Sequence, residues 1–327
     1  MSRIRSFATR LRKSGQMVSE FALDLAYYLR HSGISPFQDA NRKLFYKIII
    51  ETHAIEKGLS LREPRPLFGR DKIRFIMAAC RRYDRRHSLM PVSMATGALS
   101  AYGQLHRERG IDDPLIGEIE EFVAEMAHDV GISANGGLRQ LDQPAPNHAA
   151  SPHDFLASRF SCRMFRREAL PRDVIERLVA IAQSAPSQCN RQATHLHCFQ
   201  DRARIDSLLR LQAGSAGFAE DVPCLFVVST DFAAWGGPQQ RHQGFVDGAL
   251  FAMSLMLSLH GAGIASCPLN LAVDHRRERD IRRVAGIPEH HRLVMMIAAG
   301  FPLARTVKAA RSPRRDVAEI LRFGDAS

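Results

Sequence analysis

Apolar residues recur at helical spacing through the first part of the chain. Such stripes predict helices over residues 17–30, 39–52, 71–83, 91–106 and 114–130. No segment with the two-residue period of a strand interrupts them. A stretch rich in Gly, Asn and Pro follows at 131–151 and indicates a linker. The pattern therefore predicts an all-α extension over residues 1–150 that ends in this linker.

After the linker the pattern changes to strands that alternate with helices. Strands are predicted over residues 195–200, 224–229, 264–268 and 293–299, and helices over 171–182, 203–211, 247–261 and 276–285. The strand at 224–229 is apolar throughout, which is typical of a strand covered on both faces. The pattern predicts a second domain over residues 151–327, an α+β sandwich with helices on both faces of a sheet.

The segment 248–267 is apolar or small at almost every position, and only His260 is strongly polar. A helix that is apolar all round is buried, either in a core or in a membrane. Asp247 suits the positive end of a helix, and the Gly-Ala-Gly run at 261–263 ends it after about 15 residues, too few for a bilayer span. We therefore expect a buried core helix, no transmembrane span, and a short strand that Pro268 stops.

Composition limits the classes of function. The net charge is +11, but acidic residues are interleaved with basic ones, so no nucleic-acid partner is expected. Six scattered cysteines without a C-x-x-C pair argue against a zinc site or a disulfide framework, and they fit a reducing, cytoplasmic location. Residues 1–13 are basic and amphipathic. A solvated tail is expected there, with a transit peptide or weak contact with an anionic membrane surface as alternatives.

A loop is predicted where His53, Glu56, Lys57 and Gly58 precede an Arg-Pro-Leu-Phe-Gly run at 65–69. Its charges could form a lid or an anion-binding loop. The interpretation that we favour is a helix end, in which Gly58 terminates the helix and Lys57 lies at its negative end.

Two polar segments of the second domain carry candidate chemistry. Arg159, Ser161 and Arg163 alternate with other residues, and two guanidinium groups beside a hydroxyl suit a phosphate group. The loop 185–192, Ala-Pro-Ser-Gln-Cys-Asn-Arg-Gln, carries amides and a hydroxyl that can meet the polar edge of a flat heterocycle. Each segment alone is equally compatible with a solvated face or a turn-rich connection.

Other familiar sites find no support in the sequence, which contains no G-x-G-x-x-G, P-loop or G-x-S-x-G segment. His195 and His197 alternate on a predicted strand and could begin a metal site. No third ligand follows at a suitable spacing, so we expect sheet residues and no metal.

Taken in order, five segments resemble the nitroreductase family of FMN flavoproteins. Residues 159–165, RFSCRMF, resemble its Arg-x-Ser-x-Arg/Lys-x-Phe motif, and 184–192, SAPSQCNRQ, resemble its Ala-Pro-Ser-x-x-Asn-x-Gln loop. Residues 246–270 are similar to its Asp-x-Gly-x-Ala helix and the glycine-rich exit into the strand beneath the flavin. The AAGFP segment at 298–302 and the Arg-Ser-Pro segment at 311–313 are similar to its C-terminal features.

The resemblance implies a nitroreductase-like three-layer α+β sandwich with a central mixed sheet, in a homodimer with the flavin sites at the subunit interface. FMN would be the cofactor, with NAD(P)H as co-substrate. The implied flavin-binding residues are Arg159, Ser161, Arg163 and Arg311 at the phosphate, Pro186, Ser187, Asn190 and Gln192 in a loop, and Ser266, Cys267 and Pro268 along the ring. In this family such a loop often comes from the partner subunit.

The implied activity is reduction of a small electron-poor substrate, nitroaromatic, quinone-like or enone-like, by ping-pong hydride transfer. FMN would carry this chemistry, so no catalytic side chain is assigned. The first alternative is a non-catalytic flavin-fold scaffold or sensor whose helical half binds a protein partner. The second is nucleic-acid binding, which the charge invites but no groove-reading motif supports.

The sequence also departs from the family pattern. Gln192 is followed by Ala193 and Thr194, where the family usually has Pro-Trp, and the single tryptophan, Trp235, lies in a glycine-rich loop from which it could stack over the site. A Pro-Leu-Asn run at 268–270 is similar to the iodotyrosine-deiodinase-like branch. The helical N-terminal half is unusual for the family, so the substrate stays open.

Overall fold

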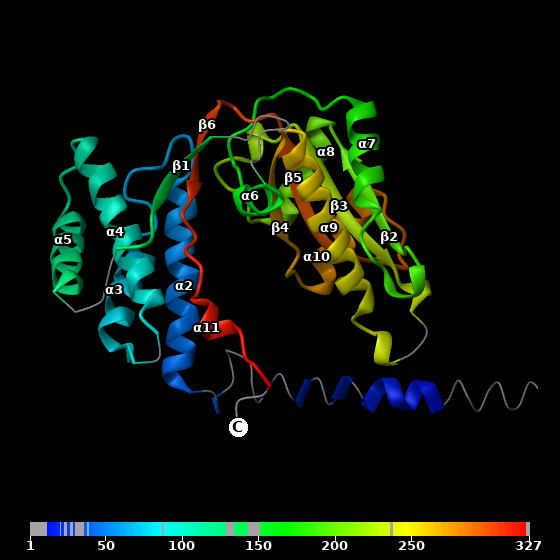
Figure 1. Cartoon of the computed structure of the whole chain (residues 1–327), viewed down its shortest axis with the longest axis horizontal. Coiled ribbons are helices and arrows are strands. Elements are labelled where there is room, and N and C mark those ends of the chain that lie inside the picture. The colour runs from blue at the N-terminus through cyan, green and yellow to red at the C-terminus, as the bar shows by residue number, and fades with distance from the viewer. Residues whose placement is uncertain are drawn as a thin grey trace, which may run out of the picture. The chain divides into compact units, whose positions relative to one another are not determined.

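The computed structural model describes residues 12–19, 21–22, 25–26, 29, 36–37, 39–86, 88–128, 134–142, 151–235 and 238–324. Two compact units are present: Met1–Ser32 with Asp142–Val307, and Gly33–Leu141 with Lys308–Ser327 (Figure 1). The segment after residue 307 thus groups with the helices. It does not belong to the α+β unit, in which the sequence pattern had placed it.

Four helices build the second unit where the sequence predicts them, each shifted by a few residues. They are α2 Ala40–Leu59, α3 Arg70–Arg82, α4 Met90–Glu108 and α5 Pro114–Ala127. Asp113 caps α5 by accepting the N–H of Leu115, and Arg70 holds the Asp113 carboxylate with two hydrogen bonds of 2.9 Å. The described residues between 12 and 29 are also helical, which covers part of the predicted helix over 17–30.

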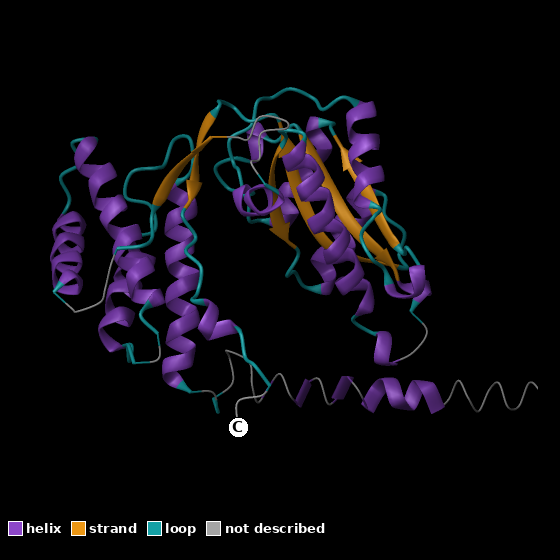
Figure 2. Ribbon diagram, in the orientation of Figure 1, coloured by secondary structure: helices purple, strands orange, loops and turns teal. Residues whose placement is uncertain are grey.

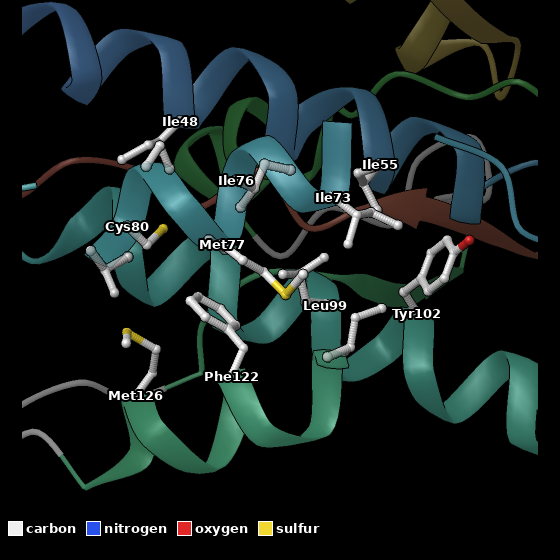
Figure 3. Packing of buried hydrophobic residues seen from close by; sticks show 14 of the residues in the cluster. Ile48, Ile55, Ile73, Ile76, Met77, Cys80, Leu99, Tyr102, Phe122 and Met126 are labelled. Atoms are coloured by element: carbon white, nitrogen blue, oxygen red, sulfur yellow. The ribbon is translucent and has the colours of Figure 1, made fainter. Parts of the chain in front are cut away.

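These helices bury a contiguous apolar core. Each helix contributes side chains at helical spacing, among them Ile48, Ile73, Leu99 and Phe122, all fully buried. Figure 3 shows them converging between α2, α3, α4 and α5. The prediction of an all-α region is confirmed for the part of the chain described between residues 39 and 128.

The predicted loop after residue 53 is instead the end of α2, which continues to Leu59. Gly58 does not terminate this helix. A Cβ on it would lie 2.1 Å from Cε2 of Phe68, so the missing side chain lets this ring pack against the helix. Glu56 is fully buried and accepts hydrogen bonds from the Gly137 N–H (3.0 Å) and the His53 ring (3.2 Å). The favoured interpretation of a helix end is supported, since α2 ends at Leu59 with Lys57 in its last turn.

Strands β1 and β6 pair in a two-stranded sheet, and the sequence pattern predicted neither of them. They span Leu138–Asp142 and Thr306–Ala310, and a short helix α11 follows at Val317–Ile320. Each strand has only five residues, and their pairing joins distant parts of the chain. A period-two pattern is too short to recognise in such segments.

The α+β unit alternates helices and strands as predicted (Figure 2). Its elements are α6 Pro152–Ser158, α7 Arg172–Ala182, β2 Thr194–Phe199, α8 Arg202–Gln212, β3 Cys224–Asp231, α9 Gln243–Gly261, β4 Ala265–Asn270, α10 His275–Ala285 and β5 His291–Gly300. Helices α7 and α9 pack on each other and α9 on the sheet, while α8 pairs with α10. The three-layer sandwich is therefore confirmed.

The sheet has the order β2-β3-β5-β4, and every pair of neighbours is antiparallel. Among the described strands the sheet is thus antiparallel, where the family resemblance implied a mixed one. Strand β4 continues through Pro268 to Asn270, so this proline does not stop the strand as expected. A proline is tolerated there because β4 lies at the edge of the sheet, where one side of the strand needs no ladder hydrogen bonds.

Helix α9 has two apolar faces with different environments. Its inner face, including Ala252, Leu255 and Leu259, is fully buried in the core formed with β3 and β5. Val246, Leu250 and Met253 on its outer face are 50%, 43% and 41% exposed. Helix α9 is long and apolar enough to cross a membrane, but buried core helices of soluble proteins meet the same criterion. Its packing on the sheet favours a core helix.

Helix α9 approaches the sheet closely because its inner face carries glycine. A Cβ on Gly248 would lie 2.7 Å from Cγ2 of Val294 in β5, closer than real Cβ atoms come to their neighbours. The absent side chain therefore sets the depth at which α9 sits on its own sheet.

Candidate functional site

The segment with the two predicted arginines runs beside the edge strand β4. The Cys162 N–H donates to the Ser266 carbonyl oxygen at 2.9 Å, and the Arg166 N–H donates to the Phe301 carbonyl oxygen at 2.9 Å. Phe160 and Cys162 are buried, whereas Arg159, Ser161 and Arg163 are half-buried. Because the polar residues alternate with buried ones, the two guanidinium groups and the hydroxyl lie toward the other side of the segment.

The structure brings this segment together with the predicted residues of β4. The side chains of Ser266 and Cys267 are buried, at 4% and 1% exposure, and Pro268 is half-buried. Burial raises the pKa of the Cys162 thiol to about 11, with Cys267 nearby, so the Cys162 thiol stays neutral at physiological pH. Since the side chains of Ser266 and Cys267 are both buried, β4 offers a ligand mainly its backbone.

His260, near the C-terminal end of α9, supports the arginine segment and was not predicted as a site residue. Its Nε2 atom lies 2.8 Å from the Ser158 hydroxyl, directly before Arg159. Burial lowers the pKa of His260, and the positive charge of Arg159 lowers it further. His260 is therefore neutral beside the guanidinium group of Arg159, and it adds no negative charge that would neutralise this guanidinium.

The second predicted group is the loop before β2, which is anchored by Asp247 of α9. The Gln188 N–H donates to Oδ2 of Asp247 at 3.0 Å, and the side-chain amide of Gln243 donates to Oδ1 at 2.7 Å. The Gln192 N–H donates to the Ser187 hydroxyl at 3.1 Å, which closes the loop on itself. The sequence marked Asp247 as a helix start, and its role as an anchor depends on a contact across 59 positions of the chain.

This loop lines a cavity of about 250 Å³. Pro186, Ser187, Gln192 and Asp247 contribute to its wall, together with apolar side chains of α7 and α9. Asn190 lies in the short 3₁₀ turn Gln188–Asn190 of the same loop, and its side chain is outside the described ones. The cavity therefore combines an apolar floor with a few polar groups, as small-ligand sites do.

The loop backbone is held in an uncommon conformation. Cys189 and Gln192 have φ values of 53° and 48°, which non-glycine residues seldom adopt. Arg191 lies over the ring of Trp235, 5.1 Å from its centroid, and the indole N–H donates to the Thr230 hydroxyl at 3.2 Å. The sequence had suggested that Trp235 could stack over the site. In the structure it is instead buried, at 9% exposure.

One chain does not bring the two groups of predicted residues together. Asp247 holds the loop near the start of α9, whereas His260 lies beside the arginine segment near its end. Thirteen residues separate them (260 − 247), which corresponds to about 20 Å along a helix. The loop and the arginine segment of the same chain therefore lie too far apart to contact the same part of a ligand.

Arg311, the last predicted phosphate ligand, lies in the other compact unit, just after β6. Its N–H donates to the Gly137 carbonyl oxygen at 2.9 Å. Burial lowers the pKa of Arg139, and the charges of Arg314 and Arg311 lower it further. Arg311 is thus one of three neighbouring arginines, two of which the sequence did not single out.

The α+β sandwich, the paired basic residues beside an edge strand and a polar loop at a cavity are the features that the nitroreductase resemblance leads us to expect. The comparisons with known proteins agree. Residues 156–214 and 200–301 match the profile of the nitroreductase family. The C-terminal α+β part of the chain is thus similar to this family over residues 156–301.

Known proteins are similar to about half of the chain. An NADH dehydrogenase of Thermus thermophilus is 23% identical over 188 residues, which cover 47% of this chain and 88% of the relative. An FMN-dependent nitroreductase from Clostridium difficile is 18% identical with a TM-score of 0.44, covering 53% of this chain and 98% of that one. NfrA2 of B. megaterium is 19% identical with a TM-score of 0.47, covering 53% and 74%.

Proposed function

We propose that the protein is an FMN-dependent NAD(P)H oxidoreductase that acts as a homodimer, with each flavin site built from two subunits. The family is FMN-dependent, and the relatives described above include an NADH dehydrogenase and an FMN-dependent nitroreductase. The observation that carries the proposal is the separation of the arginine segment and the loop at opposite ends of α9. Two antiparallel copies of α9 would place the loop of one subunit beside the arginine segment of the other.

The exposed face of α9 supports this arrangement. Val246, Leu250 and Met253 form an apolar stripe on the helix, and a partner subunit would cover it. Leu255 and Met256, at 0% and 6% exposure, contact the chain's own core instead. The helix therefore has one face for its own sheet and one for a second copy.

The residues of the chain fit the parts of FMN by their chemistry. Arg159, Ser161 and Arg163 would hold the phosphate, because two half-buried guanidinium groups and a hydroxyl match its charge and its acceptors. Arg311 is assigned to the phosphate by the family resemblance of its Arg-Ser-Pro segment alone. Pro186, Ser187, Asn190 and Gln192 would contact the flavin from the partner's side, while the backbone of β4 at Ser266–Pro268 would lie along its ring.

When bound, FMN would supply hydride transfer from NAD(P)H to a small electron-poor substrate such as a nitroaromatic, quinone-like or enone-like molecule. The protein would bind and orient both molecules and exclude water. Asp247 would keep the loop in place, and His260 would keep the arginine segment on β4. A cytoplasmic location and the absence of a nucleic-acid partner stay part of this proposal.

An absorbance spectrum of the purified full-length protein tests the proposal. We expect a yellow protein with about one FMN per chain, which bleaches when NADH or NADPH is added without oxygen. A folded, colourless protein that ignores added FMN would contradict it and would favour the non-catalytic scaffold. Flavin that stays oxidised with both nicotinamides would rule out the oxidoreductase and point to a flavin sensor.

A further inference from the structure

Three side chains from three neighbouring strands gather at one end of the α+β sheet. His195 lies near the start of β2, Asp231 ends β3, and His291 begins β5. The strand register places Asp231 directly opposite His291, and His195 opposite Ser229. One potential ligand atom from each of the three residues lies within 4.8 Å of the other two. Antiparallel pairing thus supplies the third ligand that the sequence around His195 lacks.

Hydrogen bonds fix the orientation of the most buried member of this group. His291 is 5% exposed, and its Nδ1 atom lies 3.1 Å from the Ser229 hydroxyl. The same hydroxyl lies 3.0 Å from Nε2 of His197. If Nδ1 of His291 donates to Ser229, whose O–H donates to His197, the Nε2 lone pair of His291 is available to a ligand. Metal-binding histidines are commonly oriented by such a bond through their other ring nitrogen.

The two histidine rings of this group also lie close to each other. The ring centroids of His195 and His291 are 4.5 Å apart. One cation between them can bind a nitrogen of each ring, since neutral imidazole is the form that binds metals.

We propose that His195, Asp231 and His291 bind one divalent transition-metal ion of the zinc(II) type at this end of the sheet. Two imidazoles and a carboxylate are a common ligand set for such ions, whereas Mg²⁺ and Ca²⁺ prefer oxygen ligands alone. Zinc bonds of about 2.1 Å require tetrahedral ligand atoms about 3.4 Å apart. The ligands therefore move inward on binding, and the exposed side chain of His195 can turn toward the other two.

The ion would join β2, β3 and β5 beside the cavity described above. His195 and Thr194 line that cavity together with Ser187 and Gln192. An ion held by His195 would therefore stiffen one wall of the cavity and connect it to the core of the sheet. The inference does not depend on flavin binding, because none of the three ligands is among the proposed FMN contacts.

Zinc titration of the full-length protein, made without a polyhistidine tag and stripped with EDTA, tests this site. Calorimetry should show one Zn²⁺ per chain with a micromolar or tighter Kd, and Zn²⁺ should raise the Tm. His195→Ala and Asp231→Asn should each weaken binding at least about tenfold and abolish the rise in Tm. Ser229→Ala keeps all three ligands, and loss of its orienting bond should weaken binding about tenfold.

The control is His153→Ala, which removes an exposed histidine of α6 and should leave the titration unchanged. Matching Tm values in EDTA would show that the variants are folded. Two results would overturn the site: no saturable binding of Zn²⁺ by the wild-type protein, or an unchanged Kd and an unchanged rise in Tm in His195→Ala.

Discussion

The carboxylate of Asp247 accepts the backbone N–H of Gln188 at 3.0 Å and so ties α9 to the loop before β2. Asp247 is 3% exposed, and its loss would leave this N–H without its acceptor. We expect Asp247→Ala to lower the free energy of unfolding by about 1–3 kcal/mol, measured in urea. Asp247→Asn keeps one acceptor oxygen and should lose less.

A surface ion pair provides the control for this prediction. Asp206 pairs with Arg202 at one-turn spacing on α8 and is partly exposed, so Asp206→Ala should change stability by less than about 0.5 kcal/mol. Equal losses for Asp206→Ala and Asp247→Ala would mean that the Gln188 contact contributes no more than an exposed pair.

Replacing Arg159 and Arg163 together by alanine should weaken FMN binding on the order of 100-fold or more, because two charge-assisted contacts to phosphate are lost. Riboflavin has no phosphate, so its affinity should change little. Flavin fluorescence titration measures both ligands, and Arg276→Ala, an exposed arginine of α10, serves as control. Parallel losses for FMN and riboflavin would move the phosphate elsewhere.

Leu250→Asp or Met253→Asp on the outer face of α9 should convert the proposed dimer into a folded monomer. A carboxylate buried without a partner is strongly destabilising, which corresponds to a rise in dimer Kd of about 100-fold or more. Light scattering after gel filtration reads the mass. Ile50→Asp changes an apolar side chain of α2 that is 60% exposed and should leave the mass unchanged. A dimer that persists in both α9 variants would place the interface on another face.

Gly58→Ala should lower the Tm of the helical unit, although alanine favours a helix interior by about 1 kcal/mol. The added Cβ would meet the Phe68 ring at 2.1 Å, and overpacking of this kind costs about 1–3 kcal/mol. Gly117→Ala on α5 meets nothing within 4 Å and should instead stabilise the protein. The double change Gly58→Ala with Phe68→Leu should recover part of the loss.

Acid should destabilise the protein partly through His260, whose folded-state pKa is lowered by burial and by Arg159. The unfolded chain then binds more protons than the native one, so this contribution is complete above about pH 6.5 and is lost as pH falls. His260→Gln should make the decline of unfolding free energy between pH 7 and 5 shallower, by at most about 1.4 kcal/mol per pH unit. His153→Gln, which replaces an exposed histidine of α6, serves as the control.

Local pattern was enough to locate most helices and the four strands of the main sheet, because their periods are set within ten or so residues. The same pattern failed for β1 and β6, which are short and stabilise each other across the chain. Strand β4 was expected to end at Pro268, since the sequence does not reveal which strand lies at an edge.

The site was predictable only in pieces. The residues of the arginine segment and of the loop were recognised from motifs, yet their separation along α9 depends on the fold. His260 and the contact of Asp247 with Gln188 are invisible in the sequence, because their partners are distant along the chain. The group of His195, Asp231 and His291 arises from strand register alone.

Gly248 lets α9 sit deep on β5, where a Cβ would meet Val294 at 2.7 Å. The thickness of this layer fixes how far Leu250 and Met253 protrude on the opposite side of the helix. A larger residue at position 248 would lift the helix and shift that outer surface without touching it. In the proposed dimer, a substitution in the interior at position 248 would therefore also change how well two subunits fit together, so selection on assembly would act on a residue that contacts no partner.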